Sequence, residues 1–194
     1  MRKIGIVGAG GLGREVLGIL ESINRKKKYW DIIGFFDDNS HDELINGLPV
    51  IGNIDSINKI NEDLAIVIGV GNPNIKEKII NRIENQNISF PTILHPTVEI
   101  YSESTVNLGK GIVIGANSVL TTNISVGDFV YINTASIISH DTKIGEYSMI
   151  MPTVSISAGA TIGKKVYIGN GTKIDQPVII EDNGFIKAGT FFSK

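Results

Sequence analysis

The histidine–aspartate pair at positions 140 and 141 is the strongest candidate for chemistry in this sequence. The chain has no cysteine and only three histidines, so thiol catalysis is excluded and imidazole is the best proton acceptor near neutral pH. A carboxylate directly after His140 would fix the tautomer of the imidazole and increase its basicity, as suits a general base. The alternative interpretation is an exposed histidine without a catalytic role.

The other two histidines are weaker candidates. His41 lies in a polar segment typical of a solvated loop, and His95, followed by Pro96, favours a structural or capping role. A zinc site would need several histidines at a repeating spacing, and this pattern is not found. The sequence therefore predicts no metal site.

A glycine-rich segment, Gly8-Ala9-Gly10-Gly11-Leu12-Gly13, is the second candidate. It stands between an apolar strand and a segment with helical spacing, a context that binds phosphate groups at a helix N-terminus. Asp37 and Asp38 end the next strand, where Asp37 would accept hydrogen bonds from a ribose or uracil group. Alternatively, the glycines only permit close strand–helix packing. NAD is a competing ligand, but this short domain lacks the second half that would hold a nicotinamide.

Composition excludes several functional classes. A net charge of −2 over 194 residues gives no general attraction to nucleic acid or to an anionic membrane. The only basic run, Arg25 to Lys28, follows a helical segment and is interpreted as a solvated helix C-terminus. The sequence shows neither a signal peptide nor a long apolar span. We expect a cytoplasmic protein with no nucleic-acid or membrane partner.

A six-residue period dominates the second half of the chain. A branched aliphatic residue occupies every sixth position from Leu108 to Ile186, without exception. No helix has this period, and a simple amphipathic strand would alternate every two residues. The pattern is typical of a solenoid of short parallel strands, in which each aliphatic side chain points inward and stacks on its equivalent one coil away.

A second period of 18 residues predicts three strands in each coil. Glycine recurs at this spacing, at Gly109, Gly127, Gly145 and Gly163. We expect these glycines to form a column at one tight corner, where residues that tolerate positive φ are favoured. The same spacing places Ala158 one coil away from His140. A main-chain N–H of residues 157–159 could then stabilise the oxyanion that forms when an amine or hydroxyl attacks a thioester.

The first half alternates strands and helices. Strands are predicted at residues 3–8, 30–36 and 64–70, and helices at about 14–27 and 74–84. This alternation is typical of a small doubly wound α/β sheet. We therefore expect two domains, a Rossmann-like domain at residues 1–92 and a β-helix domain at residues 93–194.

Both halves resemble a known family. The repeat is similar to the left-handed parallel β-helix of the hexapeptide acyltransferases, and the handedness is taken from that resemblance. The whole chain resembles the bacterial sugar acetyltransferases of the sialic-acid O-acetyltransferase and bacillosamine N-acetyltransferase type. The segments that carry this resemblance are Gly8–Gly13, Phe36–Asp38, Ile68–Asn72, Leu94–Pro96 and Ile132–Asp141.

The resemblance implies roles for particular residues. It makes His140 the general base, Asp141 its partner and Asn133 a neighbour of the acceptor. The sugar nucleotide would be held by Gly8, Gly10, Gly11, Gly13, Asp37, Asp38, Gly71 and Asn72. Acetyl-CoA, the co-substrate, would lie in a groove between neighbouring β-helices of a homotrimer. Its contacts would be Met149, Ala158, Gly159, Asn170 and Ala188.

The sequence departs from the family pattern close to the expected acetyl group. Met149 stands where a second histidine is common, and Ala158 stands where glycine is usual. The sequence also ends at Lys194 without the usual Gly-x-Pro-Ala tail. We expect these departures to change the choice of acyl group or acceptor, to slow catalysis, or to abolish activity.

These observations together predict an acetyl-CoA-dependent acetyltransferase acting on the amino group of a UDP-linked amino sugar in surface-glycan synthesis. His140 would serve an amine or a hydroxyl nucleophile, so O-acetylation of sialic acid or a related sugar is an alternative. A second alternative is a non-catalytic trimeric protein that binds a sugar nucleotide.

Overall fold

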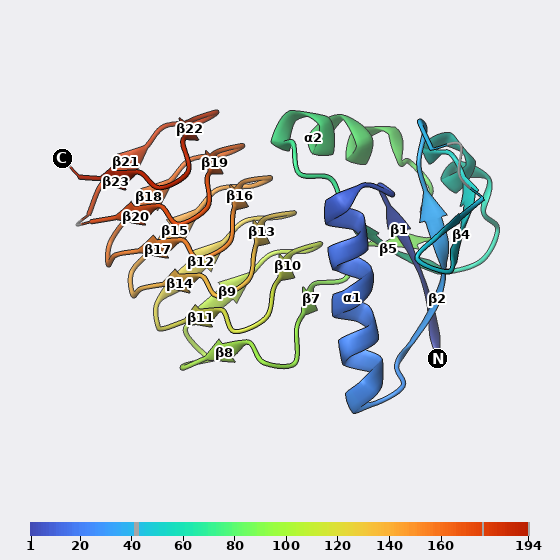
Figure 1. Ribbon diagram of the computed structural model, residues 1–194, viewed down its shortest axis with the longest axis horizontal. Helices are drawn as coiled ribbons and strands as arrows, with labels where there is room; N and C mark the ends of the chain where they lie inside the picture. Colours follow the sequence, from blue (N-terminus) through green and yellow to red (C-terminus); the bar gives the residue numbers. More distant parts are fainter. Residues whose placement is uncertain (41–42, 176, 194) are drawn as a thin grey trace. The chain divides into compact units, whose positions relative to one another are not determined.

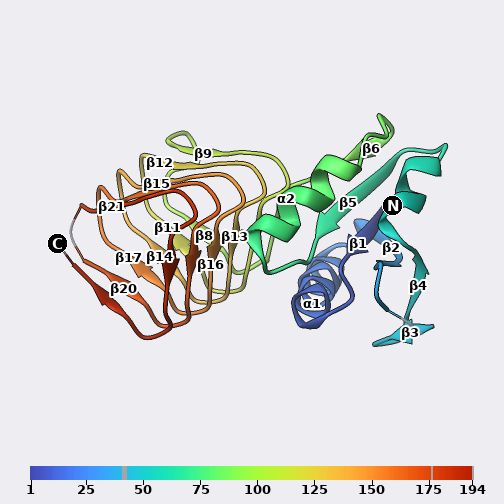
Figure 2. The ribbon, with the colours of Figure 1, turned by 90° about the horizontal axis from the view of Figure 1, so that it is seen from above.

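The computed structural model describes residues 1–40, 43–175 and 177–193, and the chain divides into two units, Met1–Ile93 and Leu94–Lys194. Unit 1 is an α/β domain built on a mixed sheet, and unit 2 is a parallel β-helix (Figures 1 and 2). The predicted combination of an α/β domain and a hexapeptide-repeat β-helix is confirmed. His41 lies outside the described residues.

Unit 1 alternates strands and helices. Its elements are β1 (Arg2–Val7), α1 (Gly11–Lys26), β2 (Trp30–Phe36), β3 (Leu44–Ile45), β4 (Leu48–Gly52), the 3-10 helix η1 (Ile54–Lys59), β5 (Leu64–Ile68), α2 (Pro73–Arg82) and β6 (Ile88–Ser89). No helix in the described part of the chain is both long and apolar enough to span a bilayer.

In the sheet of unit 1, the order in which the chain adds its strands reverses at β1. The strand order is β3-β4-β2-β1-β5-β6, with only the β3–β4 pairing antiparallel among the described pairs. The chain therefore leaves β1 toward β2 on one side and returns to β5 on the other. In open α/β sheets, ligands bind beyond the carboxyl ends of the strands at such a reversal.

Both helices of unit 1 begin earlier than their apolar spacing predicts. α1 begins at Gly11, after an N-cap glycine, Gly10, with extended backbone. α2 begins at Pro73, a position where the missing N–H of proline is not needed, and the side chain of Asn72 caps it. Apolar periodicity reports the face of a helix that packs, whereas the first turn is set by caps.

Unit 2 consists of short strands, most of them two residues long. They are β7 (Ile93–Leu94), β8 (Glu99–Ile100), β9 (Val106–Leu108), β10 (Val113–Ile114), β11 (Val119–Leu120), β12 (Ile124–Val126), β13 (Tyr131–Ile132), β14 (Ile137–Ile138), β15 (Lys143–Ile144), β16 (Met149–Ile150), β17 (Ser155–Ile156), β18 (Thr161–Ile162), β19 (Tyr167–Ile168), β20 (Lys173–Ile174), β21 (Ile179–Ile180), β22 (Phe185–Ile186) and β23 (Phe191–Phe192).

Three parallel sheets form the faces of the β-helix. Each described pairing from β9 onward joins residues 18 apart, whereas β8 pairs with β11 at a spacing of 20, with Glu99 opposite Val119. Ile132 pairs with Ile150, and Ile150 pairs with Ile168. The inward aliphatic residues form one continuous core, in which Ile132, Ile150 and Ile168 are fully buried. The six-residue period therefore predicts the register of unit 2 from β9 onward, but not the two extra residues of the first coil.

The glycine column at one corner has a different cause from the one expected. Gly109, Gly127, Gly145 and Gly163 are absent from the positions with positive φ, so that expectation is wrong. A Cβ atom at any of them would instead approach the backbone of the next coil within 3.0 Å. These glycines are needed because successive coils stack closely there, and the positive φ falls two residues later, at Gly111, Phe129, Tyr147, Lys165 and Asn183.

Candidate functional site

His140 and Asp141 form a hydrogen-bonded pair at a corner of the β-helix, directly after β14. The Nδ1 atom of His140 lies 2.7 Å from Oδ2 of Asp141, and each side chain is 57% exposed. Hydrogen bonds from His140 and, second, from Asn123 hold the pKa of Asp141 below its ordinary value. When Nδ1 carries the proton and donates it to the carboxylate, Nε2 is available to accept a proton from a substrate.

The next coil places main-chain groups beside this pair. Ile138 pairs with Ile156, so Ala158 is the register partner of His140. The Gly159 N–H donates to the His140 carbonyl oxygen at 2.9 Å, and the Ser157 N–H donates to the Ile174 carbonyl oxygen. Within the described residues, no main-chain acceptor takes the Ala158 N–H. Of residues 157–159, Ala158 is therefore the one whose N–H makes no main-chain hydrogen bond to a described residue.

The remaining acetyl-CoA and acceptor residues lie elsewhere on unit 2. Asn133 is buried after β13, and its Oδ1 accepts from the Thr134 N–H at 2.7 Å. Asn170 and Ala188 are exposed and one coil apart, at the corner that follows β19 and β22. Met149 is buried in β16. The structure therefore brings Ala158 and Gly159 to His140, and it places Asn133, Asn170 and Ala188 at a different corner.

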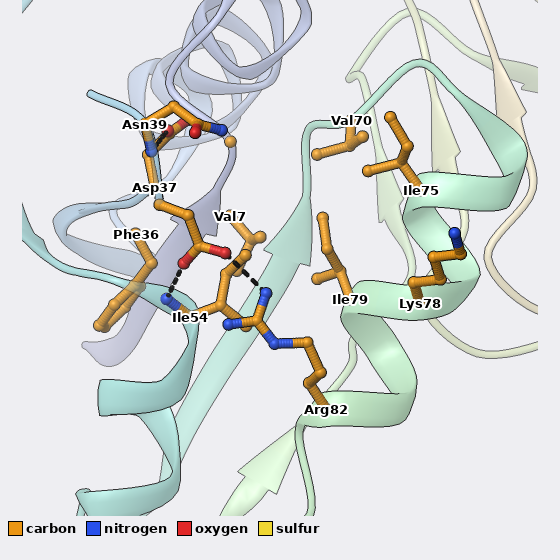
Figure 3. A pocket seen from close by; sticks show the side chains of 12 residues that line it. Val7, Phe36, Asp37, Asn39, Ile54, Val70, Ile75, Lys78, Ile79 and Arg82 are labelled. Carbon is orange, nitrogen blue, oxygen red and sulfur yellow. Dashed lines mark hydrogen bonds and ion pairs between the residues drawn. The ribbon is translucent and has the colours of Figure 1, made fainter.

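A cavity of about 400 Å³ lies at the carboxyl ends of β1, β2 and β5 in unit 1. This is the point where the sheet reverses direction. Apolar side chains from β1, β2, η1 and α2 make most of its wall, and polar side chains come from the end of β2 and from α2 (Figure 3). The lining residues are Val7, Gly8, Phe36, Asp37, Asp38, Asn39, Ile54, Val70, Ile75, Lys78, Ile79 and Arg82.

Asp37 lines this cavity, but main-chain amides already occupy its carboxylate. Oδ2 accepts from the Ala9 N–H at 2.8 Å, and Oδ1 accepts from the N–H groups of Asn39 and Ser40 at 2.8 and 3.0 Å. These bonds tie the glycine-rich turn to the end of β2. The geometry therefore gives Asp37 a structural task, because its carboxylate fixes the turn against the end of β2.

Asp38 is held from two sides. Its Oδ1 accepts from the Ile54 N–H at 2.9 Å, and its Oδ2 accepts from Nη1 of Arg82 at 2.6 Å. Burial raises the pKa of Asp38, but the hydrogen bonds from Arg82 and Ile54 outweigh it, so the pKa lies below its ordinary value. Arg82 also donates to Asp55 through Nε and Nη2. One guanidinium thus joins α2 to the end of β2 and to η1.

The glycines predicted to bind the sugar nucleotide, together with Asn72, have three different roles. They permit close packing, cap a helix or line the cavity. A Cβ atom at Gly13 would collide with the carbonyl oxygen of Gly8, so Gly13 permits the close strand–helix approach. Gly10 and Gly11 meet no backbone that would exclude a side chain. Asn72 accepts from the N–H groups of Asn74 and Ile75 and therefore caps α2, directly after Gly71. Among these residues, only Gly8 lines the cavity.

Several residues of these sites were not singled out from the sequence. Lys78 and Arg82 line the cavity one helical turn apart, a spacing that the sequence carries. Asn123 contacts Asp141 from the preceding coil, and the 18-residue spacing that locates Ala158 would also have located it. In the described part of the chain, no three histidine, aspartate or glutamate side chains gather as a metal site would require.

Two family models match this sequence. The N-terminal domain of PglD matches residues 3–83, and the bacterial transferase hexapeptide of six repeats matches residues 141–176. A search of curated proteins finds no match.

Solved structures are similar to this chain over nearly its whole length. The acetyltransferase domain of PglB from Neisseria gonorrhoeae FA1090, in complex with acetyl coenzyme A, is 27% identical with a TM-score of 0.90, covering 99% of this chain and 91% of that one. WeeI from Acinetobacter baumannii AYE is 28% identical with a TM-score of 0.88, covering 100% and 92%.

A more distant structure shares the fold. It is a histidine variant of GDP-perosamine N-acetyltransferase from Caulobacter crescentus, solved with CoA and GDP-perosamine. It is 19% identical with a TM-score of 0.86, covering 97% of this chain and 87% of that one.

Proposed function

Because this chain belongs to the PglD-type family of hexapeptide-repeat sugar acetyltransferases, we propose that it transfers the acetyl group of acetyl-CoA to the amino group of a UDP-linked amino sugar, with His140 as the general base. The observation that carries this proposal is the exposed His140–Asp141 pair with the Ala158 N–H one coil away. Acetyl-CoA as the donor is supported by its presence in the similar neisserial acetyltransferase domain.

The reaction needs one base and one oxyanion donor. The amine nitrogen attacks the thioester carbonyl carbon while Nε2 of His140 accepts a proton from it, so a C–N bond forms and the carbonyl oxygen becomes an oxyanion. The Ala158 N–H is the available main-chain donor for that oxygen. When the intermediate collapses, the C–S bond breaks and the CoA thiolate takes the proton from the imidazolium.

The cavity in unit 1 suits a nucleotide. Its apolar wall offers a surface for a base, and Asp38 and Asn39 offer hydrogen-bonding groups at the edge. The N-terminus of α1 adds a site for phosphate, because Gly10 provides no side-chain cap and the first turn contains no acidic residue. The guanidinium of Arg14 extends back over Gly11, within 4.0 Å of where a Cβ atom would lie. A diphosphate there would meet both main-chain N–H groups and a cation.

We also propose a trimer in which acetyl-CoA lies between neighbouring chains. His140, Ala158 and Gly159 share one corner, whereas Asn170 and Ala188 share another corner of the same β-helix. One bound molecule would contact both sets if the first corner of one copy faced the second corner of its neighbour. A symmetric ring of three copies provides such a repeated, head-to-tail contact.

The proposal is tested by measuring acetyl-CoA turnover with UDP-amino sugars, GDP-amino sugars and sialic acid, using wild type and His140→Ala. We expect turnover with a UDP-amino sugar and a loss of roughly 10²–10⁴-fold in kcat in the variant, because a general base contributes about that much. Turnover with sialic acid alone would instead favour O-acetylation. Thioester cleavage that is absent with every acceptor would favour a non-catalytic binding protein.

A further inference from the structure

We propose that Asn123 is a positioning residue that orients the His140–Asp141 pair from the preceding coil, an inference that rests on the proposed role of His140 as the base. Asn123 is 18 residues before Asp141 and occupies the equivalent corner position one coil earlier. Its side-chain Nδ2 donates to Oδ1 of Asp141 at 3.2 Å.

The two hydrogen bonds of Asp141 use different oxygens of the carboxylate. Oδ1 accepts from Asn123, and Oδ2 faces Nδ1 of His140. A single contact between two groups that are each 57% exposed would hold the carboxylate weakly, because water competes for both oxygens. The second contact limits rotation of the carboxylate and so keeps Oδ2 directed at the imidazole. Its contribution to the low pKa of Asp141 agrees with this geometry.

The backbone at this corner explains why asparagine is suited to the task. Asn123, Asp141 and Gly159 occupy successive coils, with φ of 54°, 61° and 74°. Asparagine and aspartate adopt this left-handed region more readily than other residues that carry a side chain, although Phe129, Tyr147 and Lys165 also adopt it at another corner. Asparagine and aspartate therefore satisfy the backbone and also supply side chains that hydrogen-bond along the corner, whereas glycine would satisfy the backbone alone.

Asn123 is itself held in place from the coil before it. The Asn123 N–H donates to Oγ1 of Thr105 at 3.2 Å, and that hydroxyl also lies 2.8 Å from Oγ1 of Thr122. A chain of hydrogen bonds therefore runs from Thr105 through Asn123 and Asp141 to His140. Its last member, the imidazole, is the only one that would contact the substrate.

The test uses Asn123→Gly and Asn123→Asp, with Asn117→Gly as the matched control. Glycine keeps the left-handed backbone and removes only the amide. Asn117 has the same conformation (φ 58°), is exposed, and donates its N–H to Oγ1 of Thr97, as Asn123 does to Thr105.

We expect kcat to fall roughly 3–10-fold in Asn123→Gly, which corresponds to the loss of one charge-assisted hydrogen bond. In Asn123→Asp we expect a larger loss, because two carboxylates then repel each other. The control should keep wild-type kcat.

A readout independent of turnover is the proton position on the imidazole. Nitrogen-15 NMR at about pH 8.5, where an ordinary imidazole is neutral, distinguishes the two tautomers, and the His140 signals are identified by their loss in His140→Gln. We expect the fraction with the proton on Nδ1 to fall in both Asn123 variants and to stay unchanged in Asn117→Gly.

The two proposals fail in distinguishable ways. An active wild-type enzyme with unchanged kcat and an unchanged tautomer in Asn123→Gly would overturn the positioning role and leave the proposed function intact. A tautomer shift in a protein that cleaves no thioester would support the orientation by Asn123 and overturn the proposed function. An equal loss of kcat in Asn117→Gly would show that the effect belongs to the corner backbone and overturn the role of the amide.

Discussion

At the scale of single residues, His140 and Asp141 meet because Asp141 adopts a left-handed conformation at the corner (φ 61°), so that its carboxylate reaches the preceding imidazole. A hydrogen bond between two exposed groups contributes little to the free energy of unfolding. Its effect is on the orientation of the imidazole, which decides the nitrogen that is free to accept a proton.

A substitution at a single residue, Ala158, would test whether its N–H stabilises the oxyanion. Gly159 has a φ of 74°, so residue 158 holds the turn position at which proline is favoured before a residue with positive φ. Pro152 already precedes Thr153 (φ 60°) in this way at the previous corner. We expect Ala158→Pro to remove the N–H while preserving the turn, and therefore to lower kcat by roughly 10²–10³-fold. Steady-state kinetics measures the loss.

A thermal melt is the control for this variant. An unchanged Tm together with the loss of kcat would assign the effect to the missing N–H. Full activity in Ala158→Pro would show that a different group stabilises the oxyanion. Ala158→Gly completes the series, because it keeps the N–H and removes the methyl group.

At the scale of elements, the cavity of unit 1 depends on the contact between α2 and the end of β2. Arg82 makes this contact by bonding Asp38 and Asp55 together. The side chain of Arg82 is long, and its guanidinium donates through three nitrogens, so it can bridge two carboxylates. The width of the cavity therefore depends on a side chain from the last turn of α2.

Nucleotide affinity should depend on pH in a way that follows from Asp38. The pKa of Asp38 in the folded protein lies below the ordinary value of 3.8, so its carboxylate is ionised at pH values above 3.8. The ion pair with Arg82 is lost only when the pH falls through this lowered pKa. We expect the affinity for a UDP-sugar to be constant between about pH 5 and pH 8 and to decline below about pH 4. Isothermal titration calorimetry measures this. A decline that begins near neutral pH would contradict the assignment to Asp38.

Arg82→Met removes the bridge and keeps most of the apolar stem. We expect the affinity for a UDP-sugar to fall roughly 3–10-fold, a modest effect because both partners are partly exposed. The pKa of Asp38 should rise in this variant, so the acid decline should begin at a higher pH than in wild type. The KM for acetyl-CoA should stay unchanged. An equal rise in both constants would indicate a general loss of structure.

At the scale of the whole molecule, the proposed trimer predicts complementation between inactive variants. His140→Ala disables one corner, and Asn170→Trp should block the other by filling the proposed acetyl-CoA path. When the two variants are co-expressed in equal amounts and assemble at random, about a quarter of the shared sites have both corners intact. We expect about that fraction of wild-type activity to return.

Light scattering on the wild-type protein gives the matching measurement of mass. A trimer together with regained activity would support a site shared between copies. A trimer without regained activity would mean that each chain holds a complete site, and a monomer would contradict the proposed assembly.

The β-helix and its corner site could be predicted from the sequence, whereas much of the nucleotide cavity could not. From β9 onward each coil of the β-helix takes 18 residues, so positions along the chain convert directly into neighbours in space. That regularity predicts the register of the aliphatic core and places Ala158 next to His140. It does not distinguish a glycine needed for positive φ from one needed for close stacking, as Gly109 and Gly127 show.

In unit 1 the decisive contacts join residues that no local rule relates. Arg82 and Asp38 are 44 residues apart, and they meet because the sheet places β2 and β5 on either side of β1. The same packing decides that Asp37 bonds main-chain amides and that Asn72 caps a helix. The sequence alone determined which residue types were present at the ends of strands and helices. Only the tertiary structure decided which of these side chains hydrogen-bond within the protein and which remain available to a ligand. The reason is that hydrogen bonds between distant segments depend on the order of the strands in the sheet.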